Sequence, residues 1–321
     1  MSATTASSST PITRVAALGG GLIGQSWVAL FLAAGLEVSV YDIDPGTDER
    51  VRRSVQQAWP VLVQLGLATT AEPDLSKLST CTDAAEAVRG AQFVQESIPE
   101  RIALKHELYA AIEPALEPGA IVASSASGLT LGELQAGWQH PSHLVLGHPF
   151  NPPHLIPLVE VMGNERTAGG VVRAARDFYE SVGKVTVEVR KEVPGHIANR
   201  LQAAVWREAV HLVSEGVGTV EDVDLALATG PGVRWAIFGP TTLFHLGAGD
   251  EGLTGFCERY TESFHRWWDD LGDPRLDEAT VQQLVSGVAD ATEGRSIADL
   301  AAARDSLIAA IVAARRQHLP R

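Results

Sequence analysis

The stretch Val15-Ala16-Ala17-Leu18-Gly19-Gly20-Gly21-Leu22-Ile23-Gly24 decides the fold of this chain. Its apolar start predicts a buried strand, and its glycines predict a tight turn before a helix over residues 25–34. A second apolar run, residues 38–41, leads directly to Asp42, eighteen residues beyond Gly24. This order of strand, G-x-G-x-x-G turn, helix, strand and acid is typical of a unit that binds a dinucleotide.

Each residue of the turn has a physical task in such a unit. Gly19 permits the sharp turn, Gly21 lets the backbone approach a pyrophosphate, and Gly24 lets the helix pack closely on the sheet. The N-terminus of the helix, next to Leu22 and Ile23 of the turn, offers unpaired N–H groups to the phosphates. A glycine-rich turn with a purely structural use is the alternative, and the complete surrounding pattern makes it the weaker one.

The charge around Asp42 indicates which dinucleotide binds. Its carboxylate would accept hydrogen bonds from the adenosine ribose and would repel a 2′-phosphate. The residues that follow, Ile43-Asp44-Pro45, supply no cation to neutralise such a phosphate. Arg50, Arg52 and Arg53 lie farther on in a predicted helix, where a solvated helix face is the simpler interpretation. We therefore expect NAD rather than NADP as the cofactor.

The composition is that of an ordinary globular protein with room for two domains, since 45% of the 321 residues are hydrophobic and 20% are charged. A net charge of −14 argues against nucleic acid and against anionic membrane surfaces as partners. Cys81 and Cys257 cannot form a disulfide framework, and neither has a metal-ligand spacing, so we expect no metal site. A reducing, cytoplasmic environment fits this pattern.

The chain divides into three parts. Residues 1–10 are small and polar, lack the features of a signal or transit peptide, and are expected to be a disordered tail. Residues 11–192 alternate short apolar runs with helical segments, which predicts an α/β, Rossmann-like doubly wound sheet that binds NAD. Residues 193–321, which begin around Pro194 and Gly195, predict an all-α domain for substrate binding and dimerisation. We find no apolar stretch long enough to span a bilayer.

The boundaries of the expected elements come from apolar runs, helical periodicity, proline and glycine. The expected strands are residues 15–18, 38–41, 93–96, 121–124, 144–148 and 185–189. A helical insertion is expected over residues 48–67, with a kink or break at Pro60. In the second domain, a helix that includes Ile197 should end near Gly216, a residue typical of the position after a helix. Further helices are expected over residues 220–229, 241–246, 253–271, 278–288 and 297–315.

Polar residues stand at three places where a purely structural chain would be apolar. Two of these stretches, residues 123–129 and 147–153, follow predicted strands, and the third, residues 195–200, opens the first helix of the second domain. Ligands bind beyond the carboxyl ends of the strands in an open α/β sheet. Ser127 and His148 should lie at that edge.

These stretches resemble the 3-hydroxyacyl-CoA dehydrogenase superfamily, in order and over nearly the whole chain after the tail. The matching residues are Ser127, His148, Asn151, Pro152, Glu160, Pro194, Gly195, Asn199 and Arg200. Several linked motifs at matching spacing are far more specific than the glycine turn alone. The resemblance also implies that Glu100, Lys105 and Asn151 contact the cofactor.

The catalytic roles that the resemblance implies suit the residue types. His148 would be the general base that takes the hydroxyl proton, since an imidazole titrates near neutral pH. Glu160 would orient this imidazole and stabilise the imidazolium, while Ser127 and Asn199 would donate hydrogen bonds to the substrate oxygen. A structural histidine and an exposed strand carboxylate are the alternatives for the first two positions. A structural role is expected for His143, His154 and His196.

The second domain departs from the enzymes that act on acyl-CoA. Residues 230–240 lack the tyrosine-proline-methionine-glycine-proline stretch of those enzymes, and Arg234-Trp235 makes them similar to the family branches that oxidise L-carnitine and L-gulonate. Arg234 could bind a free carboxylate with two hydrogen bonds, and a surface ion pair is the alternative. Trp235 and the aromatic residues of 256–268 could attract the quaternary ammonium of carnitine, although helical spacing places several of them in the core.

These features predict an NAD-dependent dehydrogenase that oxidises the 3-hydroxyl group of a small hydroxy carboxylate to the 3-oxo acid. A carnitine-like substrate is favoured and an L-gulonate-like acid comes next, since a net acidic chain suits a cationic substrate better than polyphosphorylated coenzyme A. Two alternatives stay open. One is an L-3-hydroxyacyl-CoA dehydrogenase, and the other is a non-catalytic NAD-binding protein with a structural or sensing role.

Overall fold

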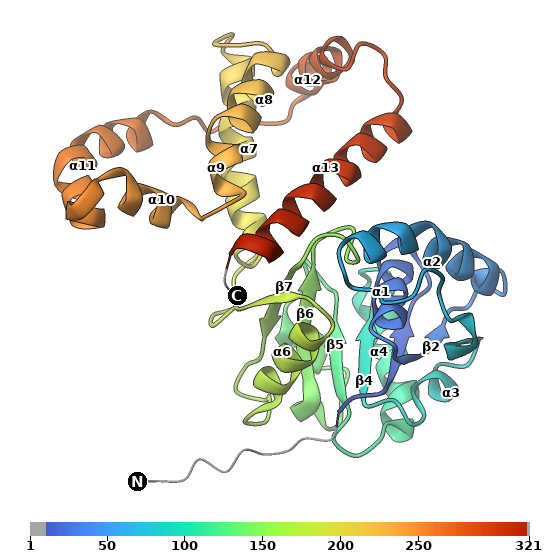
Figure 1. Cartoon of the computed structure of the whole chain (residues 1–321). Coiled ribbons are helices and arrows are strands. Elements are labelled where there is room, and N and C mark those ends of the chain that lie inside the picture. Colours follow the sequence, from blue (N-terminus) through green and yellow to red (C-terminus); the bar gives the residue numbers. More distant parts are fainter. Residues whose placement is uncertain (1–10, 320–321) are drawn as a thin grey trace. The chain divides into compact units, whose positions relative to one another are not determined.

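The computed structural model describes residues 11–319, so the expected disordered tail, residues 1–10, lies outside the described residues. The described chain forms two compact units. The first unit comprises the residues up to Ile197 together with those from Ile308 onward, and the second comprises Ala198–Leu307. The first is a sheet covered by helices, and the second contains helices and their connections (Figure 1).

The first unit is built on one sheet whose strands, within the described residues, run in the order β3-β2-β1-β4-β5-β6-β7-β8. Their bounds are Arg14–Leu18 (β1), Glu37–Tyr41 (β2), Leu78–Cys81 (β3), Phe93–Glu96 (β4), Ile121–Ser124 (β5), Leu144–Pro149 (β6), Leu158–Met162 (β7) and Val185–Glu188 (β8). Each strand expected from the sequence is present. The Rossmann-like expectation is confirmed.

The strands β3 and β7 are not predicted by the sequence, and β7 changes the topology. Every neighbouring pair in the sheet is parallel except β6 and β7, which are antiparallel. Only residues 150–157 connect these two strands, which is too short a segment for the helical crossover that a parallel pair needs. The sheet is therefore mostly parallel, with one antiparallel pair.

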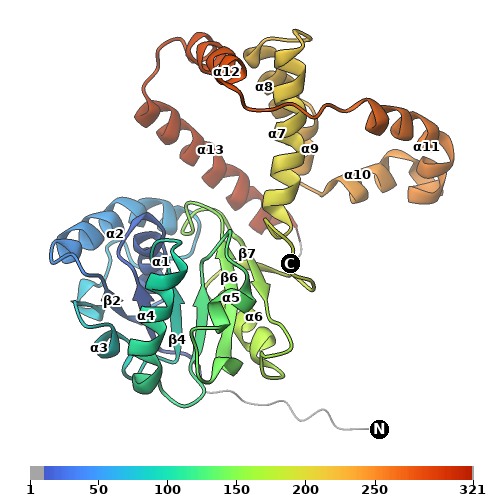
Figure 2. The ribbon, with the colours of Figure 1, turned by 180° about the vertical axis from the view of Figure 1, so that it is seen from behind.

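Helices cover both faces of the sheet, as Figures 1 and 2 show from opposite sides. Alternate residues of β1 enter different cores: Val15 and Ala17 pack with α1, α2 and α6, whereas Ala16 and Leu18 pack with α3, α4 and α5. The bounds are Leu22–Ala33 (α1), Thr47–Gln64 (α2), Ala84–Val88 (α3), Ile102–Ile112 (α4), Leu131–Gln135 (α5) and Val171–Ser181 (α6). Short 3-10 turns lie at Leu75–Lys77, Glu113–Ala115, Pro141–His143 and Gly249–Glu251.

The helix α2 continues through Pro60 to Gln64, so the break allowed for at this proline does not occur. Pro60 is exposed, whereas Val55, Trp59 and Leu62 on the inner face of the helix are buried in the core. The backbone carbonyl that loses its partner at a proline can bond to water on an exposed face. Burial of the inner face therefore keeps the helix continuous.

The end of α13 (Ile297–His318) belongs to the first unit, although the sequence assigns residues 193–321 to one helical domain. Ala309 and Val312 pack in a small buried cluster with Leu65 and Leu155. Arg316 also donates a hydrogen bond of 3.1 Å to the carbonyl of Leu65. The end of the last helix therefore groups with the first unit and not with the predicted helical domain of residues 193–321, because its apolar face packs on the first unit.

The second unit contains the start of α13 and six further helices among its described residues. Their bounds are Ala198–Ser214 (α7), Val220–Thr229 (α8), Pro231–Trp235 (α9), Pro240–Gly247 (α10), Gly252–Asp270 (α11) and Glu278–Ala291 (α12). Gly216 follows α7 in a left-handed conformation (φ +69°), as its expected position after a helix requires. Among the described residues, no helix has the length and apolar character needed to cross a membrane.

A buried lysine stabilises the segment that joins β6 to β7. The ammonium group of Lys184 donates hydrogen bonds to the carbonyls of Pro153 (2.6 Å) and Ile156 (2.5 Å). It lies 5.2 Å from the centre of the Trp27 ring. Burial lowers the pKa of Lys184 to about 7. A neutral amine still has two N–H donors, which is enough for both carbonyls.

We expect Lys184 to make the stability of this fold depend on pH. Between about 7, its pKa in the fold, and the ordinary value of 10.5, the unfolded chain binds one more proton than the folded chain. The unfolding free energy of the wild type, minus that of Lys184→Met, should therefore rise with pH by at most about 1.4 kcal/mol per pH unit. Chemical denaturation of both proteins at several pH values between 6 and 10 measures this difference in unfolding free energy. A constant difference would show that the buried amine stays charged.

Candidate active site

The glycine turn is open at Gly21 and tightly packed at Gly24. A Cβ atom on Gly24 would lie 1.8 Å from the carbonyl oxygen of Gly19, so close helix packing requires glycine there. A Cβ atom on Gly21, by contrast, would meet nothing within 4 Å. Gly21 is the N-cap of α1, where no side chain caps the helix and no acidic residue occupies the first turn. The exposed Leu22 and the half-buried Ile23 begin this helix, so its N-terminus fits an anionic group of NAD.

Asp42 lies beside the glycine turn at the end of β2. Its Oδ2 accepts a hydrogen bond from the N–H of Gly20 (2.7 Å), and its Oδ1 accepts one from the N–H of Asp44 (3.0 Å). Each carboxylate oxygen keeps a second lone pair that could accept a ribose hydroxyl. The predicted surface arginines of α2 form ion pairs along the chain: Arg50 with Asp44, Arg52 with Asp48 and Arg53 with Glu49.

His148 and Glu160 form a hydrogen-bonded pair across β6 and β7. They are direct partners in the antiparallel register, and the ring nitrogen Nδ1 of His148 lies 2.8 Å from Oε2 of Glu160. Both side chains are buried. The other carboxylate oxygen, Oε1, accepts a hydrogen bond of 2.8 Å from the N–H of Ile197. The carboxylate is thus held at both oxygens, and it orients the imidazole so that Nε2 is directed away from it.

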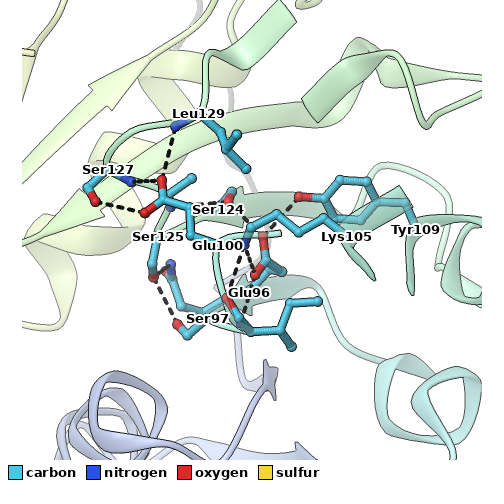
Figure 3. Close-up of polar contacts among 12 residues, drawn as sticks. Glu96, Ser97, Glu100, Lys105, Tyr109, Ser124, Ser125, Ser127 and Leu129 are labelled. Carbon is cyan, nitrogen blue, oxygen red and sulfur yellow. Dashed lines mark hydrogen bonds and ion pairs between the residues drawn. The ribbon is translucent and has the colours of Figure 1, made fainter. Parts of the chain in front are cut away.

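Ser127 lies in the loop after β5 and is held there by Glu100. The carboxylate of Glu100 accepts hydrogen bonds from the N–H groups of Ser127, Gly128 and Leu129, and from the hydroxyl group of Ser127 (3.1 Å). Figure 3 shows these bonds, with Glu100 facing Ser127 and Leu129. Burial raises the pKa of Glu100, but these hydrogen bonds outweigh it and lower the pKa overall.

Lys105, for which the resemblance implies a cofactor contact, has protein partners in this structure. Its ammonium group donates to Oε1 of Glu96 (2.5 Å) and to the carbonyl of Ile98 (3.2 Å), and the side chain is 1% exposed. The second oxygen of Glu96 accepts hydrogen bonds from the hydroxyls of Tyr109 and Ser124 (Figure 3). This buried network stabilises the connection between β4 and α4, which carries Glu100.

The remaining predicted residues are divided between the units. Asn151 is exposed in the segment that follows His148. Asn199, near the start of α7, and Arg234 and Trp235, in α9, belong to the second unit. Within the first unit, the structure therefore brings His148 to Glu160 and Ser127 to Glu100. Asn199, Arg234 and Trp235 are not part of this unit.

One histidine that the sequence assigns a structural role lies against the His148 ring. The ring centres of His196 and His148 are 5.2 Å apart, and His196 is 3% exposed. His154, by contrast, is a satisfied structural residue, since its ring contacts the hydroxyl of Ser26 at 2.8 Å. The position of His196 in the polar stretch of residues 195–200 is the sequence signal that could have identified it.

Two family models together match most of the chain. The model of the NAD-binding domain of 3-hydroxyacyl-CoA dehydrogenase matches residues 14–193, and the model of the C-terminal domain matches residues 195–285.

The chain is also similar, over nearly its whole length, to known relatives and to a solved structure. The L-carnitine dehydrogenase of Streptomyces coelicolor is 48% identical over 92% of this chain and 92% of its own length. The L-carnitine dehydrogenase of Pseudomonas aeruginosa is 43% identical over 96% of this chain and 95% of its own length. A solved structure of 5-formyl-3-hydroxy-2-methylpyridine 4-carboxylic acid 5-dehydrogenase, an NAD⁺-dependent dismutase, is 32% identical with a TM-score of 0.80. The similarity covers 95% of this chain and 98% of that one.

The space at Gly21 gives a test of cofactor binding that is separate from folding. We expect Gly21→Ala to weaken NADH binding by roughly tenfold or more, about 1.4 kcal/mol, because the added methyl group occupies the approach of the pyrophosphate. Its melting temperature should stay within about 2 °C of the wild type, since the methyl group meets no protein atom. Fluorescence titration with NADH and thermal denaturation measure the two quantities.

Two matched glycine variants complete this test. Gly169→Ala also adds a methyl group to open space, away from the glycine turn, and should change neither quantity. Gly24→Ala should instead destabilise the fold, because its Cβ would overlap the carbonyl of Gly19. Unchanged NADH affinity in Gly21→Ala would contradict the assignment of the phosphate site.

Proposed function

Because the chain belongs to the 3-hydroxyacyl-CoA dehydrogenase family, we propose that it oxidises the 3-hydroxyl group of a small hydroxy carboxylate, with L-carnitine as the favoured substrate. It is an NAD-dependent dehydrogenase that acts on a CH–OH group. The buried pair of His148 and Glu160 is the observation that carries the proposal. Such a pair can take a proton from a hydroxyl group and hold the resulting charge.

The geometry assigns a role to each member of the pair. The cofactor site would supply the hydride acceptor, NAD, for the hydrogen on C3 of the substrate. Nε2 of His148 takes the hydroxyl proton, because Nδ1 is directed to Glu160. Glu160 stabilises the imidazolium that forms, and the N–H of Ile197 keeps the carboxylate in place. The 3-oxo acid is the product, and the same residues serve the reverse reaction.

We give the other predicted residues the roles that the resemblance implies. Ser127 and Asn199 hold the substrate oxygen, as the resemblance implies, and Glu100 keeps the Ser127 loop in place. Lys105 acts on the cofactor site indirectly, through Glu96 and the connection that carries Glu100. The other residues of the proposed cofactor site are Gly19, Gly21, Leu22, Ile23, Gly24, Asp42, Glu100 and Asn151.

Three observations support L-carnitine as the substrate. The relatives reported above are named for it. Arg234 provides a guanidinium group for a free carboxylate, which a thioester lacks. Trp235, the residue after Arg234, is 39% exposed and provides an aromatic face for a quaternary ammonium. An L-gulonate-like acid is the second candidate.

A substrate panel with one variant tests this proposal. The wild type should reduce NAD with L-carnitine faster than with L-gulonate or L-3-hydroxybutyryl-CoA, measured by absorbance of the reduced nicotinamide. His148→Gln should lower kcat by roughly 10²–10⁴-fold, because it removes the base, while NADH affinity changes less than about twofold. A clear preference for the thioester would refute the role of Arg234. No turnover with any hydroxy acid would favour the non-catalytic alternative.

We also propose that two copies associate through the second unit. In Ala198–Leu307, all of which the structure describes, the buried apolar side chains are Val210, Val213, Val220 and Ala248. Large apolar side chains remain exposed there, among them Trp206 (53%), Leu225 (57%) and Val285 (58%). A surface this apolar is typical of a subunit interface.

Light scattering tests the dimer. The wild type should have a mass near 68 kDa, twice the 34.1 kDa of one chain. Trp206→Glu should shift the protein toward the monomer, because a charge is costly in an apolar interface. Val63→Glu, on α2 of the first unit, is the matched control and should stay dimeric. A monomeric wild type at micromolar concentration would contradict the proposal.

The cytoplasm is the location we propose. Cys81 and Cys257 are both free thiols, which suits a reducing compartment. Use of NAD as the electron acceptor supports the same location, because the cytoplasm holds a pool of this cofactor. Fractionation of cells with an antibody to this chain tests it, and recovery outside the cytoplasm would refute it.

A further inference from the structure

His196 is a buried polar residue without a partner of its own. Among the described residues, neither ring nitrogen of His196 has a hydrogen-bond partner, and both are shielded from solvent. The main chain of Ala126 lies near the ring, but not in hydrogen-bond geometry. An unpaired buried polar group destabilises a fold, and a phenyl ring would fill similar space without that penalty. The stability of the fold therefore does not explain why an imidazole occupies position 196.

The backbone at His196 is also strained. His196 has a left-handed conformation (φ +50°), which residues other than glycine rarely adopt. It directly precedes Ile197, whose N–H group holds Glu160. Strained backbone and unpaired buried groups together are typical of functional sites.

The distance between the two imidazoles allows a shared contact. A hydrogen bond places an acceptor oxygen about 4 Å from the centre of an imidazole ring. Two such distances and the 5.2 Å between the centres of His148 and His196 close a triangle. The separation of the rings is therefore short enough for one oxygen atom to contact both.

The charge state of His196 suits a donor. Burial, and next the adjacent His148, lower the pKa of His196, although Glu160 and Glu192 oppose this shift. The ring is therefore neutral when His148 takes up a proton, and it offers one N–H donor. In this structure the hydroxyl group of Ser127, the donor that the resemblance implies for the first unit, donates to Glu100, so Ser127 must break that bond before it can donate to the substrate.

We propose that the N–H group of His196 donates a hydrogen bond to the C3 oxygen of the substrate, the same oxygen whose proton His148 removes. This inference rests on the proposed 3-hydroxy-acid oxidation. The donor stabilises the oxygen as it gains alkoxide and then carbonyl character. His196 is then a catalytic residue that the sequence pattern does not reveal.

The test compares two replacements at this position. His196→Phe keeps a ring and removes the donor, and it should lower kcat/KM for L-carnitine by roughly 10- to 100-fold. Its melting temperature should not fall, because two unpaired nitrogens are lost, and its NADH affinity should stay within about twofold. His196→Gln restores an N–H donor and should recover part of the activity. Ser127→Ala removes the hydroxyl donor of Ser127, and its loss of activity is compared with that of His196→Phe.

The outcomes separate the possible failures. Activity of His196→Phe within about twofold of the wild type, or no gain in His196→Gln over His196→Phe, overturns the inference. A large loss in Ser127→Ala with little loss in His196→Phe overturns it as well, because the donor is then Ser127. If the wild type oxidises no 3-hydroxy acid, the proposed function fails first. If the wild type is active and His148→Gln is not, the function stands whatever His196→Phe shows.

Discussion

The hydrogen bond between His148 and Glu160 depends on the register of two strands. The residues are direct partners across β6 and β7. Side chains alternate between the faces of a sheet, so a slip of one residue would place Glu160 on the opposite face. The segment between the strands is held by Lys184, whose amine bonds to the carbonyls of Pro153 and Ile156. The geometry of the candidate base is therefore a property of the sheet.

The second constraint is the buried network at the ends of β4 and β5. Glu96 accepts hydrogen bonds from Lys105, Tyr109 and Ser124, so the buried charges and hydroxyls satisfy one another. The same connection carries Glu100, which holds the Ser127 loop. The network thus couples the interior of the sheet to the loop that borders the candidate site. A rigid support of this kind keeps polar groups in the geometry that a reaction needs.

The cofactor site and the substrate site differ in how they are built. The glycine-turn part of the proposed cofactor site is local, since the glycine turn, the start of α1 and Asp42 lie within about 25 residues of each other. The candidate base depends instead on contacts between distant segments, because Ile197 holds a carboxylate 37 positions earlier in the chain. Arg234 and Trp235 belong to the second unit.

The sequence by itself determined the dinucleotide turn, the strands around it, most helices of the second unit and the family, because these depend on local periodicity and on motifs at fixed spacing. Tertiary structure alone decided the antiparallel direction of β7, the packing of the end of α13 on the first unit and the helix through Pro60. It also paired Lys105 with Glu96 and placed His196 against His148. Contacts between distant residues follow from register and burial, which local propensity does not encode.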